Sequence, residues 1–176
     1  MFGFGSKKEK PPEKPWTMQI LTTEYLLEGQ MEPDDDFFSN AQVEDPADYL
    51  DKLTRVQIRP AGQLMPPATT LPNWYITFGK TIVALIPCDE DSLTLAQEAY
   101  EEYTHSRRVQ VYVGPYVIEG QLLNEDEDFI DFEDTSGYIP LTNAEITHLH
   151  PNAQLRSHRA AWMLVNGDLA HGFCLL

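Results

Sequence analysis

The sequence contains the same pattern twice. Residues 18–31 align without a gap with residues 109–122, and identical residues stand at five positions: Gln19/Gln110, Tyr25/Tyr116, Glu28/Glu119, Gly29/Gly120 and Gln30/Gln121. A gap of three residues in the loop before Trp74 then aligns this tryptophan with Trp162, and Gly79 with Gly167. The repeated unit has roughly 70 residues, a size at which a small domain is only marginally stable alone. We therefore predict an internal duplication of one small folding unit.

Both copies have the composition of β-strands. Short runs rich in Val, Ile, Tyr, Phe and Thr are separated by Gly, Pro and Asp. The runs predict strands at residues 18–22, 25–31, 56–60, 74–78 and 81–87, and at 109–113, 116–124, 129–132, 144–150, 162–165 and 169–176. Thr23-Glu24 and Gly114-Pro115 predict tight turns, Asn166-Gly167 predicts a type I′ hairpin, and Pro72 indicates a loop.

One helix is predicted between the copies. Leu93, Ala96, Tyr100 and Tyr103 recur at helical spacing over residues 91–104, with Asp91 or Ser92 as the cap. A shorter helical turn is predicted at residues 46–53. The resulting organisation is a disordered basic tail at 1–16, a first β-unit at 17–88, a connecting helix at 89–106 and a second β-unit at 107–176. We expect the units to pack together through the helix or through the strands after Gly79 and Gly167.

The charge argues against a polyanionic partner. The formal net charge is −16, made of +2 in residues 1–16, −10 in residues 17–108 and −8 in residues 109–176. Nucleic-acid affinity depends largely on Lys and Arg that neutralise phosphates, so both units should repel nucleic acid. The first 16 residues lack the apolar core of a signal peptide, and two cysteines are too few for a disulfide framework. We therefore expect a cytoplasmic protein.

A weak family resemblance points to a small barrel. Val109, Val111, Gly114, Gly120, Leu122 and Asp126 match one motif, and Phe78-Gly79 and Asn166-Gly167, each followed by spaced apolar residues, stand where a second motif lies. The chain resembles the Sm-like proteins, one of the SH3-like small β-barrel families. The resemblance implies that each unit is a five-stranded barrel. It does not carry over RNA binding, because the family's RNA-contacting Arg is replaced by Phe78 and Asn166, and its Asn by Ile130 or Asp131.

Two groups of residues are candidate metal sites. The acidic runs are Asp34–Asp36 and residues 125–128, the latter followed by Asp131, Glu133 and Asp134. Neither has the glycine and distal glutamate of an EF-hand, so solvated turns are favoured over a cation site. Near the C-terminus stand His148, His150, His158 and His171, of which the first two are spaced to share one strand face. They are weak zinc candidates, and surface imidazoles are the favoured interpretation, so no cofactor is predicted.

The remaining candidates also have a structural interpretation that is favoured. Cys88 and Cys174 are expected to be buried small hydrophobes, not nucleophiles. Trp74 and Trp162 are expected to be core residues, with a ligand cage as the alternative. Glu28 and Glu119, each before a glycine, are expected to be charges beside a bulge, with an acid/base pair as the alternative.

These observations favour a non-enzymatic interaction or assembly protein with an acidic surface. No catalytic set is recognisable, whereas small barrels offer strand edges to protein partners or to further copies of the chain. Two alternatives stay open. One is an Sm-like RNA-binding protein, and the other is a metal-dependent enzyme that uses the acidic turns or the C-terminal histidines.

Overall fold

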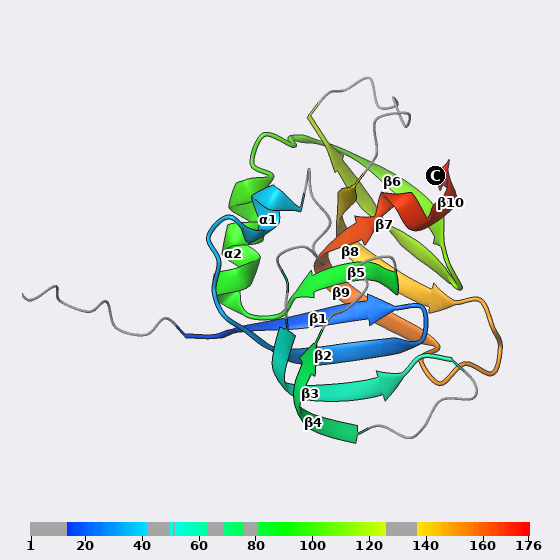
Figure 1. Cartoon of the computed structure of the whole chain (residues 1–176). Coiled ribbons are helices and arrows are strands. Elements are labelled where there is room, and N and C mark those ends of the chain that lie inside the picture. The colour runs from blue at the N-terminus through cyan, green and yellow to red at the C-terminus, as the bar shows by residue number, and fades with distance from the viewer. Residues whose placement is uncertain (1–13, 42–49, 51, 63–68, 76–80, 126–136) are drawn as a thin grey trace, which may run out of the picture.

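A single antiparallel sheet dominates the computed structural model, which describes residues 14–41, 50, 52–62, 69–75, 81–125 and 137–176 (Figure 1). Its strands are β1 (Trp16–Thr22), β2 (Tyr25–Met31), β3 (Lys52–Pro60), β4 (Thr69–Tyr75), β5 (Ile82–Pro87), β6 (His105–Val113), β7 (Tyr116–Asn124), β8 (Tyr138–His148), β9 (Ser157–Asn166) and β10 (Ala170–Leu175). Two helices, α1 (Phe37–Asn40) and α2 (Glu90–Ala99), lie together on one side of the sheet. The chain is thus mainly β, as the composition predicted.

The order of the strands divides the sheet into two halves. The order is β10-β6-β7-β8-β9-β5-β1-β2-β3-β4. We call β1 to β5 the first half and β6 to β10 the second half; in each, the fifth strand lies beside the first, and the second, third and fourth follow. The halves meet where β5 pairs with β9, through Ala84 opposite Val165 and Leu85 opposite Leu164. β5 therefore occupies the middle of the sheet, and β10 and β4 form its two edges.

The expected pair of closed barrels is not what the described residues form. The sheet is open, because β4 does not pair with β5 and β9 does not pair with β10. β5 has two edges, and both are occupied, one by β1 and the other by β9. β9 occupies this edge at Ala84 and Leu85, so β4 cannot pair along its full length.

Each half contains a bulge next to a buried glycine. The β2–β3 register shifts between Glu28 and Gln30, and the β7–β8 register shifts between Glu119 and Gln121. A Cβ on Gly29 would lie 2.9 Å from Leu53 Cβ, and a Cβ on Gly120 would lie 3.1 Å from the carbonyl oxygen of Thr142. The extra residue on the opposing strand has a positive φ in both halves, 52° at Arg55 and 51° at Asn143. Both glycines stand where the opposing strand leaves little room for a side chain, and at Gly29 a Cβ would force Leu53 to shift.

The strand register corrects the sequence alignment beyond this bulge. Leu27 lies opposite Ile58, and Ile118 opposite Ile146, so Ile58 corresponds to Ile146. The three-residue difference therefore falls before the third strand of each half and not before the tryptophans. With this shift Leu53 corresponds to Leu141. Trp74 lies opposite Leu53 and Met163 lies opposite Leu141, so Trp74 corresponds to Met163 and not to Trp162. Local residue identity misled the alignment because the bulge, not the identity, determines the pairing.

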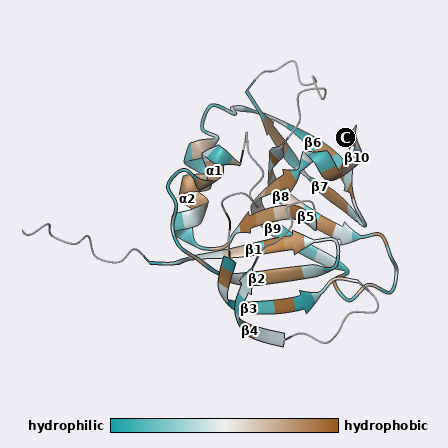
Figure 2. Ribbon diagram, viewed as in Figure 1, coloured by the Kyte–Doolittle hydropathy of each residue, from teal (hydrophilic) through white to brown (hydrophobic). Residues whose placement is uncertain are grey.

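Two hydrophobic clusters fill the space on opposite faces of the central strands. One lies under α1 and α2 and includes Met18, Leu27, Leu53 and Trp162. The other fills the second half, and its wall includes Leu21, Leu26 and Val83 from the first half. All six residues of β5 are buried, as expected for a strand covered on both faces. Figure 2 shows strongly hydrophobic residues on β1 and β5, whereas β4 at the edge is nearly neutral in hydropathy.

Side chains also connect the two halves. The Tyr116 hydroxyl donates to the Thr22 carbonyl oxygen at 2.8 Å, and burial raises the pKa of this hydroxyl. Asn166 donates from Nδ2 to the Ile82 carbonyl oxygen at 3.0 Å. The expected packing through the strand after Gly79 is therefore confirmed for β5, whereas β10 lies at the opposite end of its half.

Helix α2 begins at Glu90, one residue before the predicted helix, and ends at Ala99. Its N-cap is Asp89, whose Oδ1 accepts from the Ser92 backbone amide at 2.9 Å, so the proposed caps at Asp91 and Ser92 are wrong. Ala96 and Tyr100 on its predicted apolar face are buried, and Leu93 is half-buried. None of the helices in the described ranges is long and apolar enough to cross a membrane.

Some of the other local predictions are confirmed and others are wrong. Strands β2 and β7 have the predicted bounds, and the turns at Thr23 and Gly114 are confirmed, with Gly114 at φ 53°. Pro72 lies within β4, not in a loop, because an edge strand tolerates a missing amide donor. Asn166 caps a 3-10 helix (Gly167–Leu169) in place of a type I′ turn. Helix α1 was not predicted, and the strand predicted at 129–132 lies outside the described residues, as does most of the turn predicted at 46–53.

Candidate functional site

The four histidines occupy different surroundings. β8 ends at His148, so His150 lies beyond the strand and the two do not share a strand face as predicted. The His148 ring accepts at Nδ1 from the His150 amide at 3.0 Å and packs edge-on against Tyr116, with ring centroids 5.0 Å apart. Burial and the nearby His150 lower the pKa of His148. His158 bonds through Nε2 to Gln19 Oε1 at 2.8 Å, and His171 is exposed on β10.

Among the described residues, no three His, Cys, Asp or Glu side chains come together in a way that would hold a metal ion. Of the second acidic run, residues 126–134 lie outside this part of the chain. In the first run, Asp34 accepts from the Asp36 backbone amide at 3.1 Å and leads into α1. The Asp34 carboxylate therefore orders the turn before α1.

Both cysteines are exposed, which corrects the expectation that they are buried. Cys88 follows the last residue of β5, where its thiol donates to the Ile86 carbonyl oxygen at 3.4 Å. Desolvation of the sulfur and the nearby Glu28 carboxylate raise the pKa of this thiol to about 11. A thiol with so high a pKa is a poor nucleophile near neutral pH, because the thiolate is the reactive form.

The two tryptophans differ in burial. Trp162 is 2% exposed and packs against Phe38 and Tyr100, so its predicted core role is confirmed. Trp74 on β4 is only half-buried and meets the Tyr25 ring at a centroid distance of 6.4 Å. It lines a cavity of about 250 Å³.

The two predicted glutamates belong to one recurring arrangement. Each lies opposite a glutamine of the preceding strand: Gln19 donates to Glu28 at 2.7 Å, and Gln110 donates to Glu119 at 3.2 Å. Each is also paired with an arginine, Arg59 from β3 for Glu28 and Arg108 from β6 for Glu119. The bonds from Arg108 and Gln110 lower the pKa of Glu119. Both carboxylates stand beside the bulge, as predicted.

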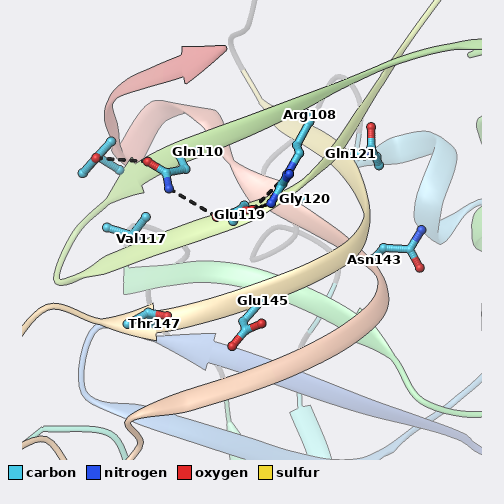
Figure 3. Close-up of a pocket in the computed structure, with 10 residues that line it drawn as sticks. Arg108, Gln110, Val117, Glu119, Gly120, Gln121, Asn143, Glu145 and Thr147 are labelled. Carbon is cyan, nitrogen blue, oxygen red and sulfur yellow. Dashed lines mark hydrogen bonds and ion pairs between the residues drawn. The ribbon is translucent and has the colours of Figure 1, made fainter. Parts of the chain in front are cut away.

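The second of these arrangements lines a surface depression of about 730 Å³ over β6, β7 and β8 (Figure 3). Its lining is mostly polar and comprises Arg108, Gln110, Tyr112, Val117, Glu119, Gly120, Gln121, Asn143, Glu145 and Thr147. Glu119 and Glu145 lie directly opposite each other on β7 and β8. Each has its own arginine, because Arg159 donates to Glu145 at 3.0 Å.

The chemistry of this depression is hydrogen bonding to neutral polar groups. Its two carboxylates are already compensated by arginines, and three amide side chains supply both donors and acceptors. The described lining therefore offers hydrogen-bond donors and acceptors to a polar ligand.

The sequence pattern did not indicate most of the residues that line this depression. Gln19 and Gln110 were identical in the repeat, and that identity was the available signal for the Gln–Glu pairs. The arginines carried no such signal, because Arg59 and Arg108 come from different strands of their halves. No protein-family model matches this sequence, and no curated protein or solved structure matches it either.

Proposed function

We propose that this chain is a non-enzymatic interaction or assembly protein, built from two copies of one five-stranded unit, that joins to further copies through its sheet edges. The observation that carries the proposal is the β5–β9 junction. There the fifth strand of the first half pairs with the fourth strand of the second half. The two edges of the sheet are the remaining fourth strand, β4, and the remaining fifth strand, β10.

A second copy would therefore find a complementary edge. Pairing β10 of one copy with β4 of the next repeats the junction that already exists within the chain. Such a head-to-tail contact is heterologous, and it closes into a ring if the rotation per copy permits.

The composition of β10 supports its role as a pairing edge. Proline and charged residues hinder pairing at a strand edge, and β10, with the sequence Ala-His-Gly-Phe-Cys-Leu, has no proline and no Asp, Glu, Lys or Arg. The complementary edge, β4, carries one proline, Pro72, which removes a single backbone donor. It runs antiparallel to β6, from Ala170 opposite Val113 to Leu175 opposite Val109. Its exposed Leu175 would be covered by an added strand.

The test measures the mass of the particle in solution. The Leu176 amide donates to the Arg108 carbonyl oxygen at 2.9 Å, so the amide of the preceding Leu175 points away from β6. Leu175→Pro thus removes a donor on the outer edge, whereas Leu175→Ala keeps it. By light scattering, we expect the wild type and Leu175→Ala to associate and Leu175→Pro to shift toward monomer. A wild-type chain that is monomeric at its highest soluble concentration would overturn the proposal.

A further inference from the structure

A second feature is the cavity of about 250 Å³ in the first half, which we call the seam pocket. It lies at the end of β1, the beginning of β2, the end of β4 and the beginning of β5. Its polar and aromatic lining includes Thr22, Glu24, Tyr25, Trp74 and Tyr75.

The seam pocket exists because the sheet curls without closing. Tyr25 on β2 and Trp74 on β4 are in ring contact, although β3 lies between their strands and they sit near opposite ends of their ladders. Such a contact requires the first half to bend over its own core. β5, however, is paired with β1 and β9 and does not pair with β4, so the curl leaves a gap between β4 and β5. The aromatic side chains line that gap.

The described lining of the seam pocket combines aromatic rings with a carboxylate and contains no basic side chain. Tyr25, Trp74 and Tyr75 supply three π-systems, and Glu24 supplies an exposed carboxylate. None of the described lining residues is Lys, Arg or His. Tyr75 is 64% exposed, so its ring is accessible to a ligand. Aromatic faces with a nearby carboxylate attract cations, and Arg and Lys side chains are the cations that proteins present.

The overall charge favours the same kind of partner. Residues 17–108, which contain the seam pocket, carry a formal charge of −10. An acidic surface steers a basic segment toward it and repels a polyanion. We propose that the seam pocket binds an arginine or lysine side chain from an extended basic segment of a partner protein. Binding of this kind goes beyond the edge pairing proposed above and does not require copies of the chain to associate.

The test is a titration of the full chain with two capped pentapeptides. One has a central arginine between glycines, and the other has glutamine in that place. Trp16 and Trp162 are buried, so a change in tryptophan fluorescence would report on Trp74. We expect the arginine peptide to bind about tenfold more tightly than the glutamine peptide, the difference made by a partly desolvated cation–π contact. Calorimetry measures the affinities of the variants.

Three substitutions locate the binding. Tyr75→Leu, at an exposed ring, and Trp74→Leu should each lower the arginine-peptide affinity severalfold, and Glu24→Gln should weaken both the affinity and its dependence on salt. Tyr112→Leu is the matched control, because Tyr112 is an exposed tyrosine, 40% accessible, on the second half. Thermal unfolding checks that Trp74→Leu still folds, and Tyr75→Leu tests the pocket without touching the core.

Equal binding of the two peptides would overturn the inference, as would an affinity that Tyr75→Leu leaves unchanged. The titration is repeated on Leu175→Pro, in which self-association is expected to be lost. Tight arginine-peptide binding by that variant would support the seam pocket separately from the edges. Loss of arginine-peptide binding in a properly folded Leu175→Pro monomer would overturn the seam pocket as an independent site.

Discussion

The fifth strands of the two halves, β5 and β10, differ in burial, although both are mostly apolar in sequence. β5 is buried along its whole length, and β10 is mostly exposed. β5 lies between β1 and β9, whereas β10 has β6 on one side and forms the edge of the sheet. The two strands therefore show that position in the sheet decides how much of an apolar strand is buried.

The largest effect should come from truncating β5. Leu85 is fully buried and lies opposite Ile20 of β1 and Leu164 of β9. Leu85→Ala should lower the free energy of unfolding by about 2–5 kcal/mol through the cavity it leaves. Leu175→Ala on β10 should change it by less than about 0.5 kcal/mol. Urea titrations followed by tryptophan fluorescence and by circular dichroism measure both values.

Leu85→Ala also tests whether the halves unfold together. Because Leu85 contacts both halves, its loss should shift one common transition seen by both probes. Two separate transitions, with only one displaced, would show that the halves are stable independently and would contradict this view of the junction.

A smaller effect is expected at the polar contact between the halves. The buried Asn166 donates to the Ile82 carbonyl oxygen and accepts at Oδ1 from the Asp168 amide at 3.0 Å. Asn166→Ala should cost about 1–3 kcal/mol, because it removes these bonds from a buried environment. Asn152→Ala, in an exposed turn, is the control and should be nearly silent in the same denaturation experiment. Equal costs for the two variants would mean that the Asn166 bonds do not stabilise the junction.

The smallest effect concerns the helix that covers the core of the first half. The Asp89 carboxylate is partly desolvated, which raises its pKa, but the bonds from the Ser92 and Thr17 amides outweigh this and the net pKa is lowered. Asp89→Ala should therefore cost about 1 kcal/mol at neutral pH through loss of the cap.

The pH dependence follows from that lowered pKa. A carboxylate with a depressed folded-state pKa stabilises the fold above its unfolded pKa of about 3.9, and this contribution is lost as pH falls through the folded value. The cost of Asp89→Ala should thus shrink in denaturation measured below about pH 4, whereas Asp91→Ala, in the exposed first turn, should cost little at either pH. A cost for Asp89→Ala that is the same at both pH values would contradict the assignment.

Within the candidate sites, the sequence predicted single residues better than groups. The Glu28 and Glu119 positions beside bulges were predicted, because glycine after a strand glutamate is a local signal. Their arginine partners were not, since Arg59 is contributed by β3 and Arg108 by β6. The seam pocket was not predicted either, because its residues on β2 and β4 come into contact only when the sheet bends.

The sequence alone determined where most strands lie and which residues turn the chain. Alternation of apolar side chains, turn residues such as Gly114 and the capped helical spacing act over a few residues, so they can be read without the fold. Tertiary structure decided which strand edges meet. Backbone amides and carbonyls are the same in every strand, so nothing local distinguishes the edge of β5 that takes β9 from an edge that would close on β4. That choice opened the sheet, buried β5, exposed β10 and left the seam pocket.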